Sequence, residues 1–450
     1  MFVENLNSAK EVKMKYRFSR YKYRYSVKDY AQMIGIVLLA IAIVTGAIAY
    51  AAHAGGKMTT VITHNMGYWI VLLIALVFGF FRKLTNPQEF TWLELPIQLL
   101  VSFVVITALF AMFFTTSTEL VDTEIWNGQV TRAEYYEEWT EERTEEYCCG
   151  HDKDGNCTST CTRTYTVHHP PEWILLSTVG KIDVNKHVYN SYVQHWKNQK
   201  KKDLYNPGQI SIGDGDMYYV TLHSNLTVPA AREKHYVNYL RASDSIKKIE
   251  GSLSGYQQFL KPYPRVHSGH LGPIEINRVI KAGVNPPTHW VNELDRQLDF
   301  ALVQLGSGKQ VNILVYLVKT SDQGFAYALE QQWVRGKKND VIVIIGSTSF
   351  PKADFCHIMA WTEVEEFKIV LRDRIMETAD ISDPQKLAQI IISQIKRGPQ
   401  NGGFERMPMA ELEYLVADIK LPWWCQVFIV LISGAASWGT SWYLIRKSII

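Results

Sequence analysis

The sequence predicts an α+β membrane protein, in which three N-terminal helices and one C-terminal helix cross the bilayer and flank a large extracytoplasmic region that contains an α/β sandwich. Three observations support this fold class. Long uncharged runs concentrate in the first 114 residues and the last 30. Four closely spaced cysteines lie between them, and buried strands alternate with amphipathic helices after residue 285. The net charge of +3 names no partner.

Four uncharged runs are long enough to act as membrane anchors: 33–52, 66–81, 95–114 and 422–445. At about 1.5 Å per residue, some 20 helical residues cover the roughly 30 Å hydrocarbon core of a bilayer. None of the runs contains Asp, Glu, Lys or Arg, whereas transport pathways usually carry ionisable or broken-helix positions at this depth. The runs therefore predict anchors rather than a transporter.

Two details of these runs predict local structure. The run 66–81 is slightly short, so we expect residues 61–65 to extend it into the interface. Small residues at Ala435 and Gly439, together with the stripe Ser433, Ser437 and Ser441, are typical of close helix packing in membranes. We therefore expect self-association, and hence a homo-oligomer, through the last helix.

The distribution of Lys and Arg predicts the orientation. The basic tail, Arg82 with Lys83, and Arg446 with Lys447 fall on one side of the membrane if all four runs cross it. By the positive-inside rule both termini are cytoplasmic, and residues 115–421 are extracytoplasmic, as in a bacterial inner-membrane protein.

The basic tail alternates basic and aromatic side chains between residues 16 and 25. Such a tail binds the anionic lipid headgroups at the surface of the bilayer. The same pattern can bind nucleic acid, but no recognisable fold presents it here, so we expect no nucleic-acid partner.

The sequence thus divides into eight segments: a basic cytoplasmic tail (1–32), three transmembrane helices (33–114), an acidic and Cys-rich extracytoplasmic insertion (115–170), a mixed α+β domain (171–287), an α/β domain (288–398), a linker (399–421), a fourth transmembrane helix (422–445) and a cytoplasmic end (446–450). Within the mixed domain, the pattern of residues 230–241 predicts a helix.

The Cys-rich insertion contains four cysteines within 14 residues: Cys148, Cys149, Cys157 and Cys161. In an oxidising compartment such a cluster predicts two disulfides at the tip of a hairpin. A bridge between the adjacent Cys148 and Cys149 would be strained, which leaves two connectivities open.

Two alternatives compete for the same stretch. Zinc would use the cysteines with His151, or with His168 and His169, although the spacing is not the usual one. Calcium would use Asp152, Asp154 and Asn156, although the glycine comes too early for a calcium loop and no glutamate closes it.

The α/β domain shows the clearest pattern. Apolar residues at helical spacing predict helices, and uninterrupted apolar runs predict buried strands. In chain order we expect a helix at 291–305 with a turn at 306–308, a strand at 311–318, a helix at 324–333, strands at 341–345 and 355–361, and helices at 363–378 and 385–396.

These elements resemble the TPM domain family, an α/β fold of membrane-anchored extracytoplasmic proteins. The resemblance rests on VNILVYLV, YALEQQWVRG, KKND and VIVII, which place Trp333, Gly336, Asn339 and Val341 where the family pattern has them. It covers about a quarter of the chain. The family's strand ending in Gly-aromatic-Gly is replaced by SFPKADFCHIMAWT, in which Asp354 is the single acidic residue.

Two functions follow as hypotheses, and no catalytic residue is identified. The first is a non-catalytic binding or assembly protein with an unidentified extracytoplasmic protein partner and no cofactor. The alternative, implied by the resemblance, is a phosphatase dependent on calcium or another divalent cation. Its ligands would be Asp354 with Asp295 and Asp299, which are four residues apart on one helix face. Cys356 and His357 are strand neighbours that point to opposite faces, which argues against a catalytic pair.

Overall fold

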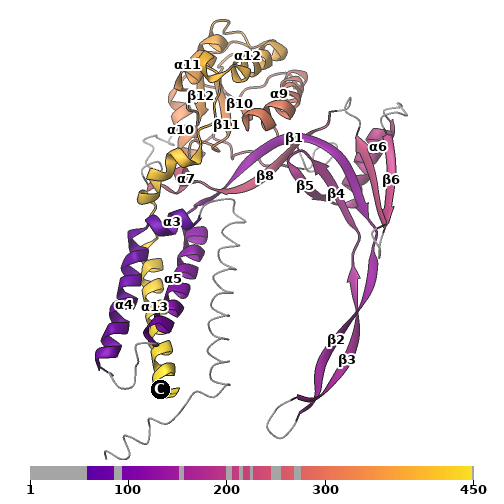
Figure 1. Ribbon diagram of the computed structural model, residues 1–450. Helices are drawn as coiled ribbons and strands as arrows, with labels where there is room; N and C mark the ends of the chain where they lie inside the picture. The colour runs from indigo at the N-terminus through magenta and orange to yellow at the C-terminus, as the bar shows by residue number, and fades with distance from the viewer. Residues whose placement is uncertain are drawn as a thin grey trace, which may run out of the picture. The chain divides into compact units, whose positions relative to one another are not determined.

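The computed structural model describes residues 58–85, 94–151, 157–198, 205–211, 216–222, 227–244, 255–267 and 275–447 (Figure 1). The predicted basic tail and the first predicted membrane helix lie outside these residues. The chain divides into two compact units. The membrane unit comprises Met1–Thr123, His235–Lys248 and Pro408–Ile450, and the α+β unit comprises Glu124–Lys234 and Ile249–Met407.

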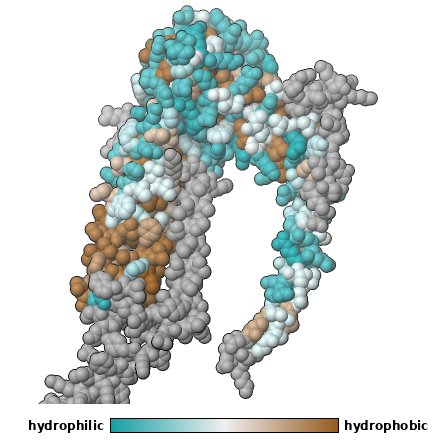
Figure 2. All heavy atoms as spheres, viewed as in Figure 1, coloured by the Kyte–Doolittle hydropathy of each residue, from teal (hydrophilic) through white to brown (hydrophobic). Residues whose placement is uncertain are grey.

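Among the described residues of the membrane unit, three helices are long and apolar enough to cross a bilayer: α4 (Met66–Thr85), α5 (Glu94–Ser117) and α13 (Trp423–Lys447). They pack against one another, and their outer surface is hydrophobic (Figure 2). Exposed Leu, Ile, Phe and Trp side chains on this surface suit contact with lipid tails. The predicted α+β membrane protein is confirmed at this level, with three of the four predicted spans among the described residues.

The serine stripe of α13 is used within the chain. Ser433, Ser437 and Ser441 are all buried, and the Ser437 hydroxyl lies 2.7 Å from that of Ser102 on α5. Small hydroxyl side chains let two helices approach closely and exchange a hydrogen bond where water is absent. The serine stripe therefore packs within the chain, while Ala435 on the same helix is exposed, and self-association through this helix stays a prediction.

Residues before α4 do not extend it as expected. They form a separate short helix, α3 (Met58–His64), and Asn65 separates it from α4. The Asn65 side-chain oxygen accepts a hydrogen bond from the Gly67 amide at 3.0 Å, which starts a new helix at this position. Helix α3 packs against the 3₁₀ segment η4 (Met409–Asp418) within the same unit.

Most of the stretch 230–241, predicted to be a helix, is a strand, which ends at Val237. Strand β8 (Pro229–Val237) pairs with β1 (Val121–Tyr136), and the remaining helix is the single turn α7 (Tyr239–Ala242). The side chain of Asn238 caps α7 by accepting hydrogen bonds from the amides of residues 240 and 241. Pairing with β1 outweighs the local helix propensity of this stretch.

The α+β unit contains a six-stranded sheet in the order β5–β4–β1–β7–β6, with β8 also paired to β1. Its pairings β1–β4, β1–β7, β4–β5 and β6–β7 are antiparallel. The other strands of this sheet are β4 (Glu172–Ser177), β5 (Gly180–Val184), β6 (Tyr205–Ser211) and β7 (Asp216–Leu222). Helix α6 (Lys186–Asn198) packs on β4. Strands β2 (Trp139–His151) and β3 (Cys157–His169) form a separate antiparallel hairpin.

A second sheet has the order β12–β11–β10–β9. Strands β9 (Val279–Ala282), β10 (Asn312–Val318) and β11 (Asp340–Gly346) are parallel, and β12 (Phe355–Ala360) is antiparallel to β11. The helices are α9 (Thr288–Lys309), α10 (Gly324–Gln332), α11 (Glu365–Met376) and α12 (Pro384–Lys396), followed by the 3₁₀ turn η3 (Pro399–Asn401).

Both faces of this sheet are covered, which explains the uninterrupted apolar strands. Alternate residues of β10, such as Val315, pack with α9, α11 and α12, whereas Leu314 and Tyr316 pack with α10 and the segment 255–267. All the helices and strands expected between residues 288 and 398 are present, but β9 was not predicted.

The expected turn at 306–308 is also wrong, because α9 continues to Lys309. A β-carbon at Gly306 would lie 2.3 Å from the backbone oxygen of Asn127 in β1. Glycine therefore serves here for the close approach of a strand to the helix rather than for a turn.

Candidate binding groove beside strand β12

Strand β12 lies at one end of the second sheet. One of its edges is paired with β11, and among the described residues no strand pairs with the other edge, although Thr362 just beyond the strand forms a single bridge with Arg406. Successive side chains of a strand point to opposite faces. Cys356 accordingly lies in the hydrophobic core, where burial raises the pKa of its thiol to about 12, whereas His357 faces a groove. The prediction that these two side chains point to opposite faces of the strand is confirmed.

The groove has a cavity volume of about 530 Å³. Four stretches of chain line it: the end of α10 with the following turn, residues 357–362 of β12 and beyond, one face of α11, and Met407 in the segment after η3. Its lining includes Glu330, Arg335, His357, Trp361, Thr362, Glu365, Lys368, Ile369, Arg372 and Met407. Three permanent cations and two carboxylates therefore face an open sheet edge.

Arg335 is held in the groove by an unusual turn. Trp333 caps α10, and the next three residues, Val334, Arg335 and Gly336, have φ angles of +49°, +60° and +73°. A left-handed conformation costs roughly 1–2 kcal/mol for a residue with a β-carbon, and such strain is concentrated at functional sites. The turn fixes the point from which the Arg335 side chain leaves the backbone.

The Arg335 side chain has unused hydrogen-bonding capacity. Its guanidinium lies 5.8 Å from the centre of the Trp361 ring, which orients the planar group. Among the described residues it forms no ion pair, and its buried Nε has no hydrogen-bond partner. A guanidinium fork with free donors matches a carboxylate or phosphate.

The other charges of the groove are paired. His357 Nε2 lies 2.9 Å from Glu330, Lys368 Nζ lies 2.5 Å from Glu365, and Arg372 pairs with a neighbouring aspartate outside the groove. The Thr362 hydroxyl accepts hydrogen bonds from the amides of residues 364 and 405 at 3.1 and 3.4 Å. The lining thus offers charged groups and hydrogen-bonding groups to a ligand. Its one hydroxyl, that of Thr362, already accepts a hydrogen bond at the start of α11.

Asp295 and Asp299, expected as metal ligands, bind one arginine instead. Asp295 accepts the amide hydrogens of Arg278 and Val279 at 2.7 and 3.2 Å, and Asp299 accepts from the Arg278 side chain at 2.5 Å. Burial, with the charge of Asp299 nearby, raises the pKa of Asp295 to about 6. These two carboxylates hold α9 against the start of β9.

Arg278 is the centre of a buried polar network that sequence reasoning missed. Its guanidinium donates to Asn312 at 2.9 Å and to Asn127 at 2.8 Å. Asn312 in turn donates to Asp340 at 2.9 Å, and the Tyr263 hydroxyl donates to both oxygens of Asp340 at 3.0 Å. Burial raises the pKa of Asp340 to about 7. The network joins β1 to the amino ends of β10 and β11.

Asp354 lies in a turn beside β12. One of its carboxylate oxygens accepts hydrogen bonds from the amide and hydroxyl of Thr348 at 2.7 and 2.6 Å, and these bonds lower the pKa of Asp354. Within the described residues, no three His, Cys, Asp or Glu side chains are arranged to hold a metal ion. Asp354 therefore does not join Asp295 and Asp299 in one ligand group.

Each of the four residues of the family pattern has a structural role. Trp333 donates its indole hydrogen to the Lys261 backbone oxygen at 2.9 Å, and Gly336 ends the left-handed turn. The Asn339 side chain donates to the backbone oxygen of residue 125 at 2.8 Å, and Val341 begins the buried run of β11. Trp333 and Gly336 thus belong to the turn that presents Arg335, whereas Asn339 and Val341 hold the start of β11.

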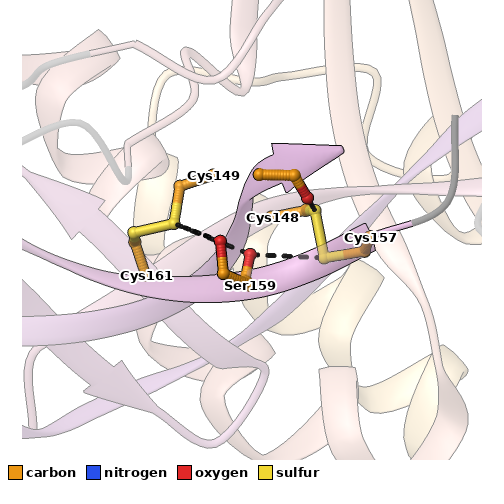
Figure 3. Close-up of a disulfide and its surroundings, with 6 residues drawn as sticks. Cys148, Cys149, Cys157, Ser159 and Cys161 are labelled. Carbon is orange, nitrogen blue, oxygen red and sulfur yellow. Dashed lines mark hydrogen bonds between the residues drawn. A yellow bond between two sulfur atoms is a disulfide. The ribbon is translucent and has the colours of Figure 1, made fainter. Parts of the chain in front are cut away.

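The clustered cysteines form two disulfides at one end of the β2–β3 hairpin (Figure 3). Cys148 is bonded to Cys157, and Cys149 is bonded to Cys161. This is one of the two connectivities expected, and it leaves the four sulfurs bonded to each other rather than to zinc. The calcium candidates at 152, 154 and 156 lie outside the described residues.

Comparison with known protein families, curated proteins and solved structures gives no match to this chain. The resemblance to the TPM domain family therefore stays a prediction, and the function has to be argued from the site.

Proposed function

We propose that this chain is a membrane-anchored extracytoplasmic binding protein, which captures an extended, acidic segment of a partner protein in the groove beside β12. The Arg335 guanidinium, strained into place and without an anionic partner among the described residues, is the observation that carries the proposal. A carboxylate of the bound segment accepts hydrogen bonds from this guanidinium.

The open edge of β12 supports an extended ligand. A peptide that adds to a sheet edge gains main-chain hydrogen bonds, while pockets along the edge select its side chains. In this groove, Trp361 and Ile369 offer apolar contact beside the charged residues Arg335 and Lys368. This combination favours a segment in which acidic and apolar residues alternate.

Peptide binding to the full-length protein in lipid nanodiscs tests the proposal. The probes are two fluorescein-labelled ten-residue peptides, one alternating valine with glutamate and the other alternating valine with lysine. We expect the acidic peptide to bind more tightly, and Arg335→Ala to weaken it at least tenfold, as is typical when a charged hydrogen bond worth about 1.5–3 kcal/mol is removed.

Arg296→Ala is the matched control. Arg296 is exposed on α9 and lies 5.7 Å from the Phe300 ring, an arrangement like that of Arg335 over Trp361. Equal binding of the two peptides, or an equal loss of affinity in both variants, would refute the proposed groove function.

The proposed location is a membrane of the bacterial inner-membrane type, with both termini cytoplasmic and residues 115–421 outside. The two disulfides support it, because disulfides persist in oxidising compartments. Alkylation of whole cells under denaturing conditions tests it: Cys148 and Cys157 should react only after reduction. Reaction without a reductant would place the hairpin in the cytosol.

A further inference from the structure

The β2–β3 hairpin is a two-stranded sheet with both outer edges unpaired in the part of the chain that the structure describes. Side chains on both of its faces are exposed: Tyr147 and Tyr165 on one face, and Thr162 and Thr164 on the other. An isolated two-stranded hairpin is marginally stable in water. The disulfides at its end stabilise it without covering either edge, so the edges stay open for pairing.

The two edges carry very different charge. Strand β2 contains four glutamates, at positions 141, 142, 145 and 146, and one arginine, Arg143, which gives it a net charge of 1 − 4 = −3, whereas β3 contains Arg163 as its one permanently charged residue. Charged side chains on an edge strand prevent it from pairing with another strand. The β2 edge is protected in this way and the β3 edge is not, which makes β3 the edge that can accept a further strand.

The sequence of β3 suits antiparallel pairing with the β3 strand of a second copy. Threonines at positions 160, 162, 164 and 166 alternate along β3, so they share one face. In an antiparallel pair of β3 strands centred on Thr164, Thr162 of each copy lies opposite Thr166 of the other. Threonine pairs across strands are favourable. On the other face, Arg163 of each copy lies opposite Tyr165 of the other, which allows a cation–π contact.

Because the residues of two β3 strands suit one another and the two edges of the hairpin differ in charge, we propose that the β3 edges of two copies of this chain pair antiparallel about a two-fold axis. The result is a four-stranded sheet in the order β2–β3–β3–β2. This inference is independent of the groove beside β12.

Charge separation favours this arrangement over the other edge pairing. With about 4.8 Å between neighbouring strands, the two acidic β2 strands lie about 14 Å apart in the proposed sheet. That exceeds the Debye length of about 10 Å at 0.1 M salt, so their repulsion is largely screened. Pairing through the β2 edges would place the same glutamates on adjacent strands.

The test introduces charged side chains at Thr162 and Thr166 in the full-length protein. Each position faces a glutamate in its own hairpin: Thr162 lies opposite Glu146, and Thr166 opposite Glu142. Three double variants are compared by light scattering of the detergent-solubilised protein over a range of concentrations: Thr162→Lys with Thr166→Lys, Thr162→Glu with Thr166→Glu, and Thr162→Lys with Thr166→Glu.

We expect the wild type and the mixed-charge variant to be dimeric. Each same-sign variant should raise the dissociation constant at least tenfold, because two like-charge pairs then meet across the two-fold axis. The double-lysine variant pairs best with the glutamates of its own hairpin, so its dissociation cannot be ascribed to unfolding of the hairpin. A monomeric wild type, or three variants with the same dissociation constant, would overturn the proposal.

Discussion

Removal of the Arg278 side chain tests whether the buried polar network holds the α+β unit together. Arg278 is 2% exposed and donates hydrogen bonds to Asp299, Asn312 and Asn127. In Arg278→Met these three acceptors lose their donor while the apolar stem is kept. Breaking a buried ion pair by removing one partner costs roughly 3–5 kcal/mol, so we expect a loss of this size in the free energy of opening of β10.

Hydrogen exchange of the β10 amides in the full-length protein measures this free energy, because the core strands open only with the whole structural unit. The control is Arg296→Met, since the Arg296 side chain is 54% exposed and pairs with Glu293 one helical turn away. An ion pair exposed to solvent in this way contributes little to stability. Similar exchange rates in the two variants would show that the network does not stabilise the unit.

Three further predictions concern local features. Gly306→Ala should destabilise the α+β unit by about 1–3 kcal/mol, because its β-carbon would overlap a backbone oxygen of β1; Gly308→Ala, in open space on the same helix, should instead stabilise it slightly in the same denaturation assay. Replacing Cys149 and Cys161 by serine removes a bridge between residues 12 apart, worth about 3 kcal/mol, so amide exchange should rise in β2 and β3 but not in β10. The carboxyl of Asp340 has a pKa raised to about 7, so the folded state retains its proton while the unfolded state, with an ordinary pKa of 3.8, releases it. Below about pH 4 both states keep this proton, so the stability that depends on it is fully present. Between pH 4 and 7 the free energy of unfolding falls by up to about 1.4 kcal/mol per pH unit. Asp340→Asn should flatten this slope in denaturation curves.

The α/β domain was predicted well because its sequence pattern is strong. The β10 and β11 strands are apolar along their whole length, since helices and the segment 255–267 cover both faces of the sheet. Strand β9 escaped prediction because it has only four residues, includes Lys281, and is defined by its pairing with β10 rather than by its own pattern.

The groove and the polar network were beyond sequence reasoning for a different reason. Arg335, His357 and Lys368 come from three separate stretches, and only the antiparallel placement of β12 brings them together. Asp295 and Asp299 were correctly placed on one helix face, but their partner Arg278 is 17 residues away from Asp295 in the chain. A pattern of acidic residues alone does not distinguish metal ligands from acceptors for an arginine.

The first and last residues of the α+β unit are both joined to the membrane unit, and this decides how many proteolytic cuts release it. Residues 123 and 408 lead to α5 and α13, which are held together in the membrane unit through Ser102 and Ser437. One proteolytic cut between them leaves each fragment still attached to a lipid-embedded helix. Release of the α+β unit from the membrane unit takes two separate cleavages, so the protein tolerates a nick that would detach a domain carried on one helix.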